Sequence, residues 1–171
     1  MQLIGAANHP AEVTAVLGFV ARVDDPALAF SQVRSLGDGL LRARSSLAKV
    51  DTQGNLKTIF ARARQAAVDA KAGEAVRVQG VQLLGLTSHA ESGPTLCSLL
   101  SAQQPEAVQL AAVDALDRFT GPRVAGELIE RWGVLNPRVR SAALNVLLKR
   151  ADRAAALLNA MQAGQVRAGE L

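Results

Sequence analysis

An internal repeat is the feature of this sequence that most limits how the chain can fold. Three nine-residue segments align when the sequence is compared with itself, and they begin at Val76, Val108 and Val139. In each segment, apolar or small residues occupy relative positions 0, 4, 5, 7 and 8, which form one face of an α-helix. The period of about 32 residues leaves space for one further helix and two turns, so each unit is predicted to be a helical hairpin.

The composition favours helices over strands. Ala, Leu and Val dominate the 49% of hydrophobic residues, there is no Tyr, and aromatic residues make up 3% of the chain. Ala and Leu are strong helix formers, and no convincing period-2 alternation predicts a strand. We therefore expect an all-α fold of about eight or nine antiparallel helices.

Proline, glycine and asparagine divide the repeats into helices. Pro105 and Pro137 precede the second and third repeated helices, where proline is well tolerated, and Asn136 can cap the third. Gly-Pro pairs at 93–94 and 121–122 predict partner helices over 94–102 and 122–132. Ser92 is the expected cap of the first partner helix. A helix from Asn55 to about Ala72 pairs with the helix from Ala75 and gives the first hairpin.

The chain is predicted to be one helical-repeat domain, with three hairpins over 55–150 between less regular ends. Residues 1–54 hold an apolar stripe and a helix that starts at Asp25-Pro26, which Gly37-Asp38-Gly39 is expected to kink or split. The stripe consists of Val13, Val16, Leu17 and Val20. Over 151–171 we expect a capping helix, begun by Asp152 and closed by Gly164, and a tail that suggests a longer natural chain.

The third repeated helix carries a known signature. Its opening run, Pro137-Arg138-Val139-Arg140-Ser141-Ala142-Ala143-Leu144, resembles the second-helix pattern Pro-x-Val-Arg-x-x-Ala of HEAT repeats, and Pro105 to Ala112 is a close variant. The resemblance implies a HEAT-like or armadillo-like α-α superhelix. It also implies a non-catalytic scaffold that binds other proteins.

A narrower resemblance covers about Asp25 to Leu171. The runs 105–116, 130–132, 137–150 and 157–166 resemble the HEAT-like region of large multidomain proteins of planctomycete-type bacteria. In that family, the region lies between a β-propeller resembling sugar dehydrogenases and a C-terminal c-type haem domain. The resemblance implies a spacer that holds such neighbours, in an extracytoplasmic setting. The chain itself contains neither neighbour, so no family chemistry is assigned to any residue.

Arg77, Gln109 and Arg140 occupy the same position in the three repeated helices. In HEAT repeats, the matching position commonly hydrogen-bonds to neighbouring units. We therefore expect a structural ladder, and a ligand-binding stripe is the lesser alternative.

Basic residues concentrate near the C-terminus. Residues 131–153 contain six basic side chains and one acid, for a local balance of +5 against +4 for the whole chain. A partner-binding basic patch could consist of Arg131, Arg138, Lys149, Arg150 and Arg153. Such a patch makes a nucleic-acid-binding HEAT-like protein the alternative function. The lack of aromatic stacking residues, and the value of cations near a helix C-terminus, make nucleic acid the less favoured partner.

No catalytic, metal or cofactor site is predicted. The single cysteine, Cys97, excludes an intrachain disulfide and a CxxCH haem motif, and it reads as a small core residue. We interpret the polar residues Ser88, His89 and Glu91 as a loop between hairpins rather than as part of a catalytic triad. Trp132, the only tryptophan, is expected to be packed at a hairpin turn. One Trp and no Tyr also argue against a HEAT-type lyase or glycosylase.

The sequence contains no targeting or membrane segment that we can identify. No apolar run is long enough for a membrane-spanning helix, and residues 1–7 lack the features of a signal peptide.

Overall fold

The computed structural model describes residues 1–170, and over this range the fold is all-α. Eleven α-helices and two short 3-10 helices follow one another, with no strand among the described residues. The all-α prediction is therefore confirmed. The expected helix number was too low because two short helices, Gln2–Ala7 and Leu47–Val50, leave no clear periodic pattern. Leu171, the last residue of the predicted tail, lies outside the described residues.

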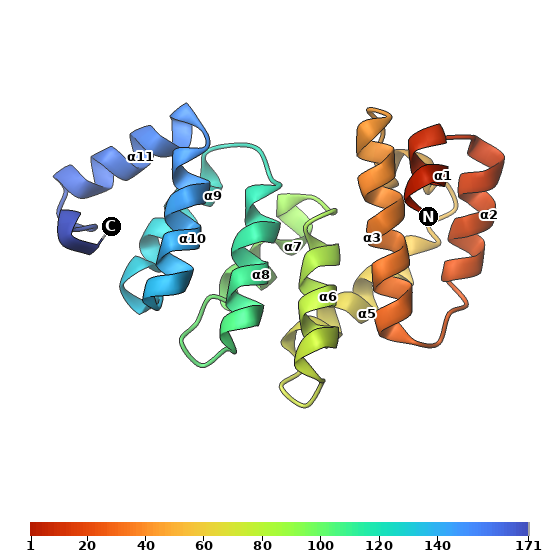
Figure 1. Cartoon of the computed structure of the whole chain (residues 1–171), viewed down its shortest axis with the longest axis horizontal. Helices are drawn as coiled ribbons and strands as arrows, with labels where there is room; N and C mark the ends of the chain where they lie inside the picture. The colour runs from red at the N-terminus through yellow and green to blue at the C-terminus, as the bar shows by residue number, and fades with distance from the viewer. Residues whose placement is uncertain (171) are drawn as a thin grey trace. The chain divides into compact units, whose positions relative to one another are not determined.

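The chain divides into two compact units, Met1–Thr87 and Ser88–Leu171, which are described separately. The first unit is arranged around one long central helix, α3, which contacts the five other helices of the unit (Figure 1). Its core is lined by apolar residues that include most of the predicted stripe. In chain order, the helices are α1 (Gln2–Ala7), α2 (Pro10–Val20), α3 (Pro26–Arg42), α4 (Leu47–Val50), α5 (Leu56–Val68) and α6 (Glu74–Leu84).

The expected split of α3 at Gly37-Asp38-Gly39 is wrong, because the helix runs unbroken from Pro26 to Arg42. Gly39 lies against Gly5 of α1. A Cβ atom on Gly39 would come within 2.2 Å of the Gln2 carbonyl oxygen, and one on Gly5 within 2.3 Å of the Leu36 carbonyl oxygen. The two glycines therefore allow the backbones of α1 and α3 to touch, and tertiary packing outweighs the low helix propensity of glycine.

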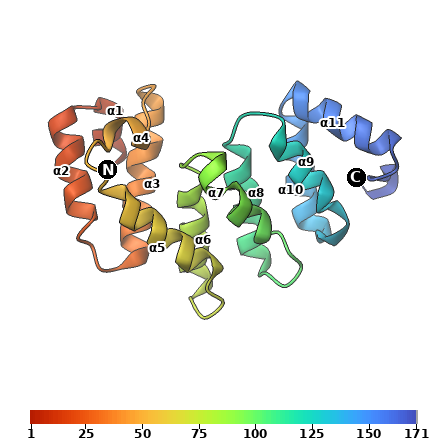
Figure 2. The same ribbon diagram turned by 180° about the vertical axis from the view of Figure 1, so that it is seen from behind.

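The second unit contains the last two repeated helices and their partners. Helix α7 packs on α8, α8 lies beside α10, and α11 contacts both α9 and α10. Figure 1 shows α8 and α10 side by side, and Figure 2 shows α7, α9 and α11 from the other side. The elements are α7 (His89–Ser98), α8 (Glu106–Asp117), α9 (Arg123–Glu130), η1 (Trp132–Val134), α10 (Pro137–Leu148), α11 (Ala151–Gln162) and η2 (Ala168–Glu170).

Helix starts follow the predicted chemistry in two places. The Asp25 carboxylate accepts hydrogen bonds from the backbone N–H groups of Ala27 and Leu28, and the Asn136 side chain accepts one from Val139. Both helices also have proline at the first helical position, as expected. Local capping chemistry was therefore sufficient to place the starts of α3 and α10.

Other boundaries differ from the prediction. Helix α7 begins at His89 instead of residue 94, because Ser88 and Glu91 form a capping box upstream, and Pro94 lies inside the helix. The predicted turn at 88–91 and the cap at Ser92 are therefore wrong. Helix α9 ends at Glu130, before its predicted end at 132, and a separate 3-10 turn carries the buried Trp132. Helix α5 ends at Val68, before the predicted end at about Ala72.

The last helix begins and ends by different means. The Arg150 backbone forms the N-cap of α11, so Asp152 lies inside the first turn and does not cap the helix. At the other end, Gly164 has φ +74° and its N–H donates to Met161, while the Gln165 N–H donates to Ala160. This is the Schellman arrangement, and it places Gly164 where it was expected.

Candidate functional site

The three residues of the predicted ladder all donate hydrogen bonds to backbone carbonyl groups. Arg77 Nε donates to Ala67 at 3.1 Å, and Arg140 Nε donates to Trp132 at 3.2 Å. Gln109 Nε2 donates to Ser101 at 2.6 Å and more weakly to Gln104 at 3.3 Å. Each acceptor lies at or just after the end of the preceding helix, in the same hairpin. These hydrogen bonds therefore join the two helices of one hairpin.

These hydrogen bonds satisfy backbone carbonyl groups at or near the ends of the preceding helices. Carbonyl groups at a helix C-terminus have no intrahelical partner, and a cationic or amide donor satisfies them and complements the helix dipole. Arg77 and Gln109 are buried, so their hydrogen bonds are shielded from water. The role of Arg77, Gln109 and Arg140 as a stabilising ladder stays a prediction.

The five residues of the predicted basic patch all face carboxylates. Arg138 pairs with Glu106 at 2.9 Å, and Lys149 pairs with Asp117 at 2.5 Å. Both pairs join residues 32 positions apart, which is one repeat period. Arg150 lies 3.5 Å from Asp152, and Arg131 lies 3.6 Å from Glu130. The repeat thus places acids of one hairpin opposite bases of the next, a signal that was available in the sequence.

Arg153 is the clearest departure from the predicted patch, because its side chain has no exposed surface. The guanidinium donates to the Asp117 carboxylate at 2.7 Å and to the Phe119 carbonyl oxygen at 2.7 Å. It also lies in the first turn of α11, not at a helix C-terminus as expected. Arg153 therefore cannot contact a partner, and it links the start of α11 to the end of α8.

Asp117 is the acid shared by two of these cations. Burial alone would raise the pKa of its carboxyl group, but hydrogen bonds from Lys149 and Arg153 outweigh burial and lower the pKa below its usual range. The carboxylate is therefore held in its charged form. Asp117, Lys149 and Arg153 therefore form a structural cluster, in which Asp117 accepts hydrogen bonds from both cations.

A second cluster connects α7 and α9. His89 Nε2 lies 2.9 Å from a Glu127 carboxylate oxygen, and its ring meets Phe119 edge to face at 5.5 Å between centroids. Arg131 donates to the Cys97 and Glu127 carbonyl oxygens. Burial, together with a hydrogen bond to Glu127, raises the pKa of the Cys97 thiol to about 12. A thiol in this state is a poor nucleophile.

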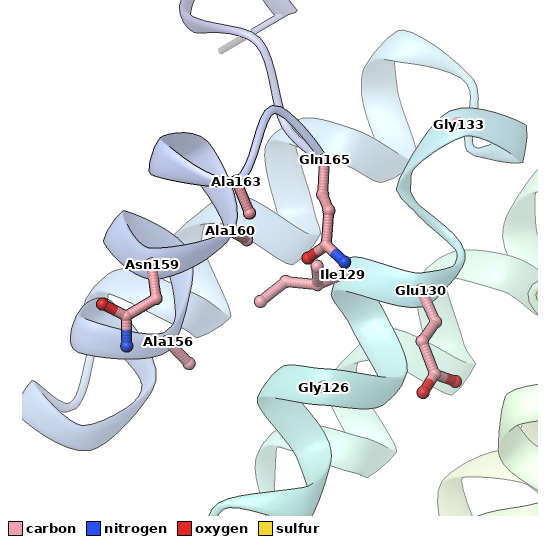
Figure 3. A pocket seen from close by; sticks show the side chains of 9 residues that line it. All are labelled: Gly126, Ile129, Glu130, Gly133, Ala156, Asn159, Ala160, Ala163 and Gln165. Atoms are coloured by element: carbon pink, nitrogen blue, oxygen red, sulfur yellow. The ribbon is translucent and has the colours of Figure 1, made fainter.

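An open groove lies between α9 and α11 (Figure 3). Its volume is about 720 Å³, within the range of ligand-binding clefts. Small residues and one isoleucine form most of its lining, two side-chain amides add polar groups, and one residue, Glu130, is charged. The lining residues are Gly126, Ile129, Glu130, Gly133, Ala156, Asn159, Ala160, Ala163 and Gln165. Sequence reasoning missed this groove, because small residues in the two helices gave no periodic signal of their own.

Two further features of the described residues concern membrane and metal binding. No helix within residues 1–170 is long and apolar enough to cross a membrane. Over the same range, no group of three or more His, Cys, Asp or Glu side chains is arranged to hold a metal ion.

Paired helices, carbonyl-capping side chains at a repeated position and ion pairs one period apart together define a helical-repeat protein. Comparison with models of protein families shows which kind of helical repeat the chain contains. The model for HEAT repeats matches residues 61–148, just over half of the chain. The chain belongs to the HEAT repeat family. No curated protein and no solved structure matches it.

Proposed function

We propose that this chain is a non-catalytic scaffold that holds or positions other proteins or protein domains. HEAT repeats are typical of protein-interaction modules, and the family match covers the hairpins at the centre of the chain. The polar side chains that most resemble reactive groups have structural partners here. Ser88 and Glu91 cap α7, and His89 pairs with Glu127.

The observation that carries the proposal is the groove between α9 and α11. In this groove, an open volume of about 720 Å³ coincides with polar groups. Repeat proteins commonly recognise partners through extended surfaces between stacked helices rather than through a reactive cluster. The groove offers such a surface on the second unit.

A finer version places the chain inside a larger protein, between a sugar-dehydrogenase-like β-propeller and a c-type haem domain. It rests on the resemblance of residues from about Asp25 onward, and the comparisons add no support for that context. The coding sequence on either side of this segment tests it. If that sequence encodes neither neighbour, this version is wrong.

The broader proposal is tested by purifying the native protein under mild conditions and crosslinking its lysines. We expect crosslinks from exposed lysines, such as Lys149, to another domain or to one stoichiometric protein. Recovery of the chain alone, with crosslinks only within it, would contradict a scaffold role.

Nucleic-acid binding through the predicted patch has less support. All five of its cations face carboxylates, and Arg153 is buried. Nucleic-acid affinity depends on cations free to neutralise phosphates, and it falls steeply with salt. Salt-dependent binding of a DNA duplex, lost when Arg138 and Lys149 are reversed in charge, would restore this alternative.

A further inference from the structure

We infer that a smaller cavity, lined by residues of η1, α10 and η2, binds a small aliphatic α-amino acid in its zwitterionic form. The cavity is partly enclosed and has a volume of about 240 Å³. Clefts for drug-sized ligands measure about 300–1,000 Å³, so this space suits a smaller molecule. The cavity is separate from the groove between α9 and α11, and the inference does not depend on the scaffold role.

Opposite charges line this cavity without pairing. Arg140 of α10 and Glu170 of η2 both contribute to its wall. Arg140 Nε donates to the Trp132 carbonyl oxygen, whereas its two Nη groups have no hydrogen-bond or ion-pair partner among residues 1–170. Glu170 accepts a hydrogen bond from the Arg167 N–H and forms no ion pair within the same range. Both charges are therefore available to a ligand.

The combination of signs selects the class of ligand. A carboxylate alone would be attracted by Arg140 but repelled by the Glu170 carboxylate, and a simple amine would meet the opposite conflict. An α-amino acid carries an ammonium group and a carboxylate on neighbouring atoms, so it can lie between the two side chains. Arginine binds carboxylates through parallel hydrogen bonds, and a glutamate carboxylate accepts from an ammonium group.

A buried indole N–H is the second, independent observation. Trp132 lines the cavity and is buried, and its Nε1–H has no hydrogen-bond partner among the described residues. Indole can only donate, and leaving a buried donor without an acceptor is unfavourable. A carboxylate oxygen in the cavity supplies that acceptor. Ser141 adds a hydroxyl group to the lining, so a carboxylate would meet neutral donors as well as the Arg140 cation.

The rest of the lining is mostly apolar. Pro137 and Leu144, both on α10, contribute to the same wall as Arg140. An aliphatic side chain buried against them would gain from leaving water. The small volume of the cavity favours alanine, valine or leucine over an aromatic amino acid.

The test uses Trp132, the only tryptophan of the chain, as a reporter inside the site. Its indole N–H gives a single cross-peak in a nitrogen–proton correlation NMR spectrum. We titrate the whole chain with L-alanine, L-valine and L-leucine, and we expect at least one of them to shift this cross-peak in a saturable way.

The best ligand is then compared with two analogues, one without the ammonium group and one without the carboxylate. For L-leucine, these analogues are isocaproate and isoamylamine. Each should bind at least about tenfold more weakly than the amino acid, because it loses one of the two charge contacts.

Two variants test the charge contacts, each with a matched control. Glu170→Gln should weaken binding of the amino acid at least about tenfold without weakening the analogue that lacks the ammonium group. Asp114→Asn, at an exposed position of α8, should change neither. Arg140→Met should also weaken the amino acid, whereas Arg138→Met, on the same helix but outside the cavity, should not. Circular dichroism establishes that each variant folds. If Arg140→Met does not fold, Glu170→Gln and the two analogues still decide the question.

The absence of a saturable shift with all three amino acids overturns the inference. An analogue that binds as tightly as the amino acid also overturns it, since one charge would then be enough. Full binding by folded Glu170→Gln or folded Arg140→Met has the same consequence, because the ligand would not lie between these two side chains.

Discussion

Arg153 is completely buried, and its charge is balanced chiefly by Asp117. Removing one member of a buried ion pair is costly, because the other charge stays in a low-dielectric environment without compensation. We expect Asp117→Asn to lower the free energy of unfolding of the second unit by about 3 kcal/mol. Trp132, the only tryptophan and a buried residue of that unit, reports its unfolding by fluorescence in urea.

The matched control for this variant is Asp114→Asn, at an exposed position of the same helix. It should change stability by less than about 0.5 kcal/mol. Equal effects of the two substitutions would mean that the carboxylate of Asp117 is not needed to balance Arg153.

Asp117 also gives the second unit a defined response to acid. Its pKa is lowered in the folded state, so between the folded and unfolded pKa values the unfolded chain binds more protons. The stabilisation is therefore complete above the unfolded value, about 3.9, and is lost as the pH falls through the folded value. The stability gap between wild type and Asp117→Asn should narrow below about pH 4 in urea titrations from pH 7 to pH 3. A gap that stays constant would show that the folded pKa is not depressed.

Arg140 and Arg138 lie two residues apart on α10 and allow a direct test of the ladder. Arg140 donates to the Trp132 carbonyl oxygen, whereas Arg138 forms an ion pair with its side chain 74% exposed. Arg140→Met should cost about 1.5–3 kcal/mol of unfolding free energy, as for hydrogen bonds that involve a charged group. Arg138→Met should cost at most about 1 kcal/mol. The reverse order in urea unfolding would remove the ladder as a stabilising feature.

At the scale of single helices, the contact between α1 and α3 depends on two glycines. A methyl group added at Gly39 would lie 2.2 Å from the Gln2 carbonyl oxygen. Because that oxygen belongs to the backbone, the clash can be relieved only if α1 or α3 shifts. We expect Gly39→Ala to destabilise the first unit by about 1–3 kcal/mol, in spite of the better helix propensity of alanine. Thermal unfolding followed by circular dichroism measures the change.

Gly18 provides the comparison in the same unit, because a Cβ atom there has open space around it. Gly18→Ala should stabilise α2 by up to about 1 kcal/mol. If Gly39→Ala were also stabilising, the close approach of α1 and α3 would not exist in solution.

The same elements show which parts of the fold the sequence could predict. Starts fixed by local chemistry, such as Asp25 for α3 and Asn136 for α10, were predictable, because the capping group lies within three residues of its partner. The continuity of α3 was not, because it depends on contact with α1, which is distant from it in the sequence. For α7, the signal at Gly93-Pro94 was outweighed by the capping box at Ser88.

For the whole molecule, charge is organised by the repeat. Glu106 with Arg138 and Asp117 with Lys149 are separated by one period, so acids of the preceding hairpin balance part of the excess of basic residues at 131–153. Counting charges along residues 131–153 could not show these ion pairs. Comparing charged residues 32 positions apart could have shown them. Neither comparison could predict the groove, because its lining residues come from α9, α11 and the residues after each of them.

We propose that this HEAT repeat chain acts by holding a protein partner at the groove of its second unit. Hydrogen–deuterium exchange on the native complex, compared with the free chain, measures whether the groove is covered. We expect slower exchange on partner binding in segments 126–133 and 156–165, with little change in α8 and α10. Protection confined to α8 and α10, or no protection in the two groove segments, would contradict it.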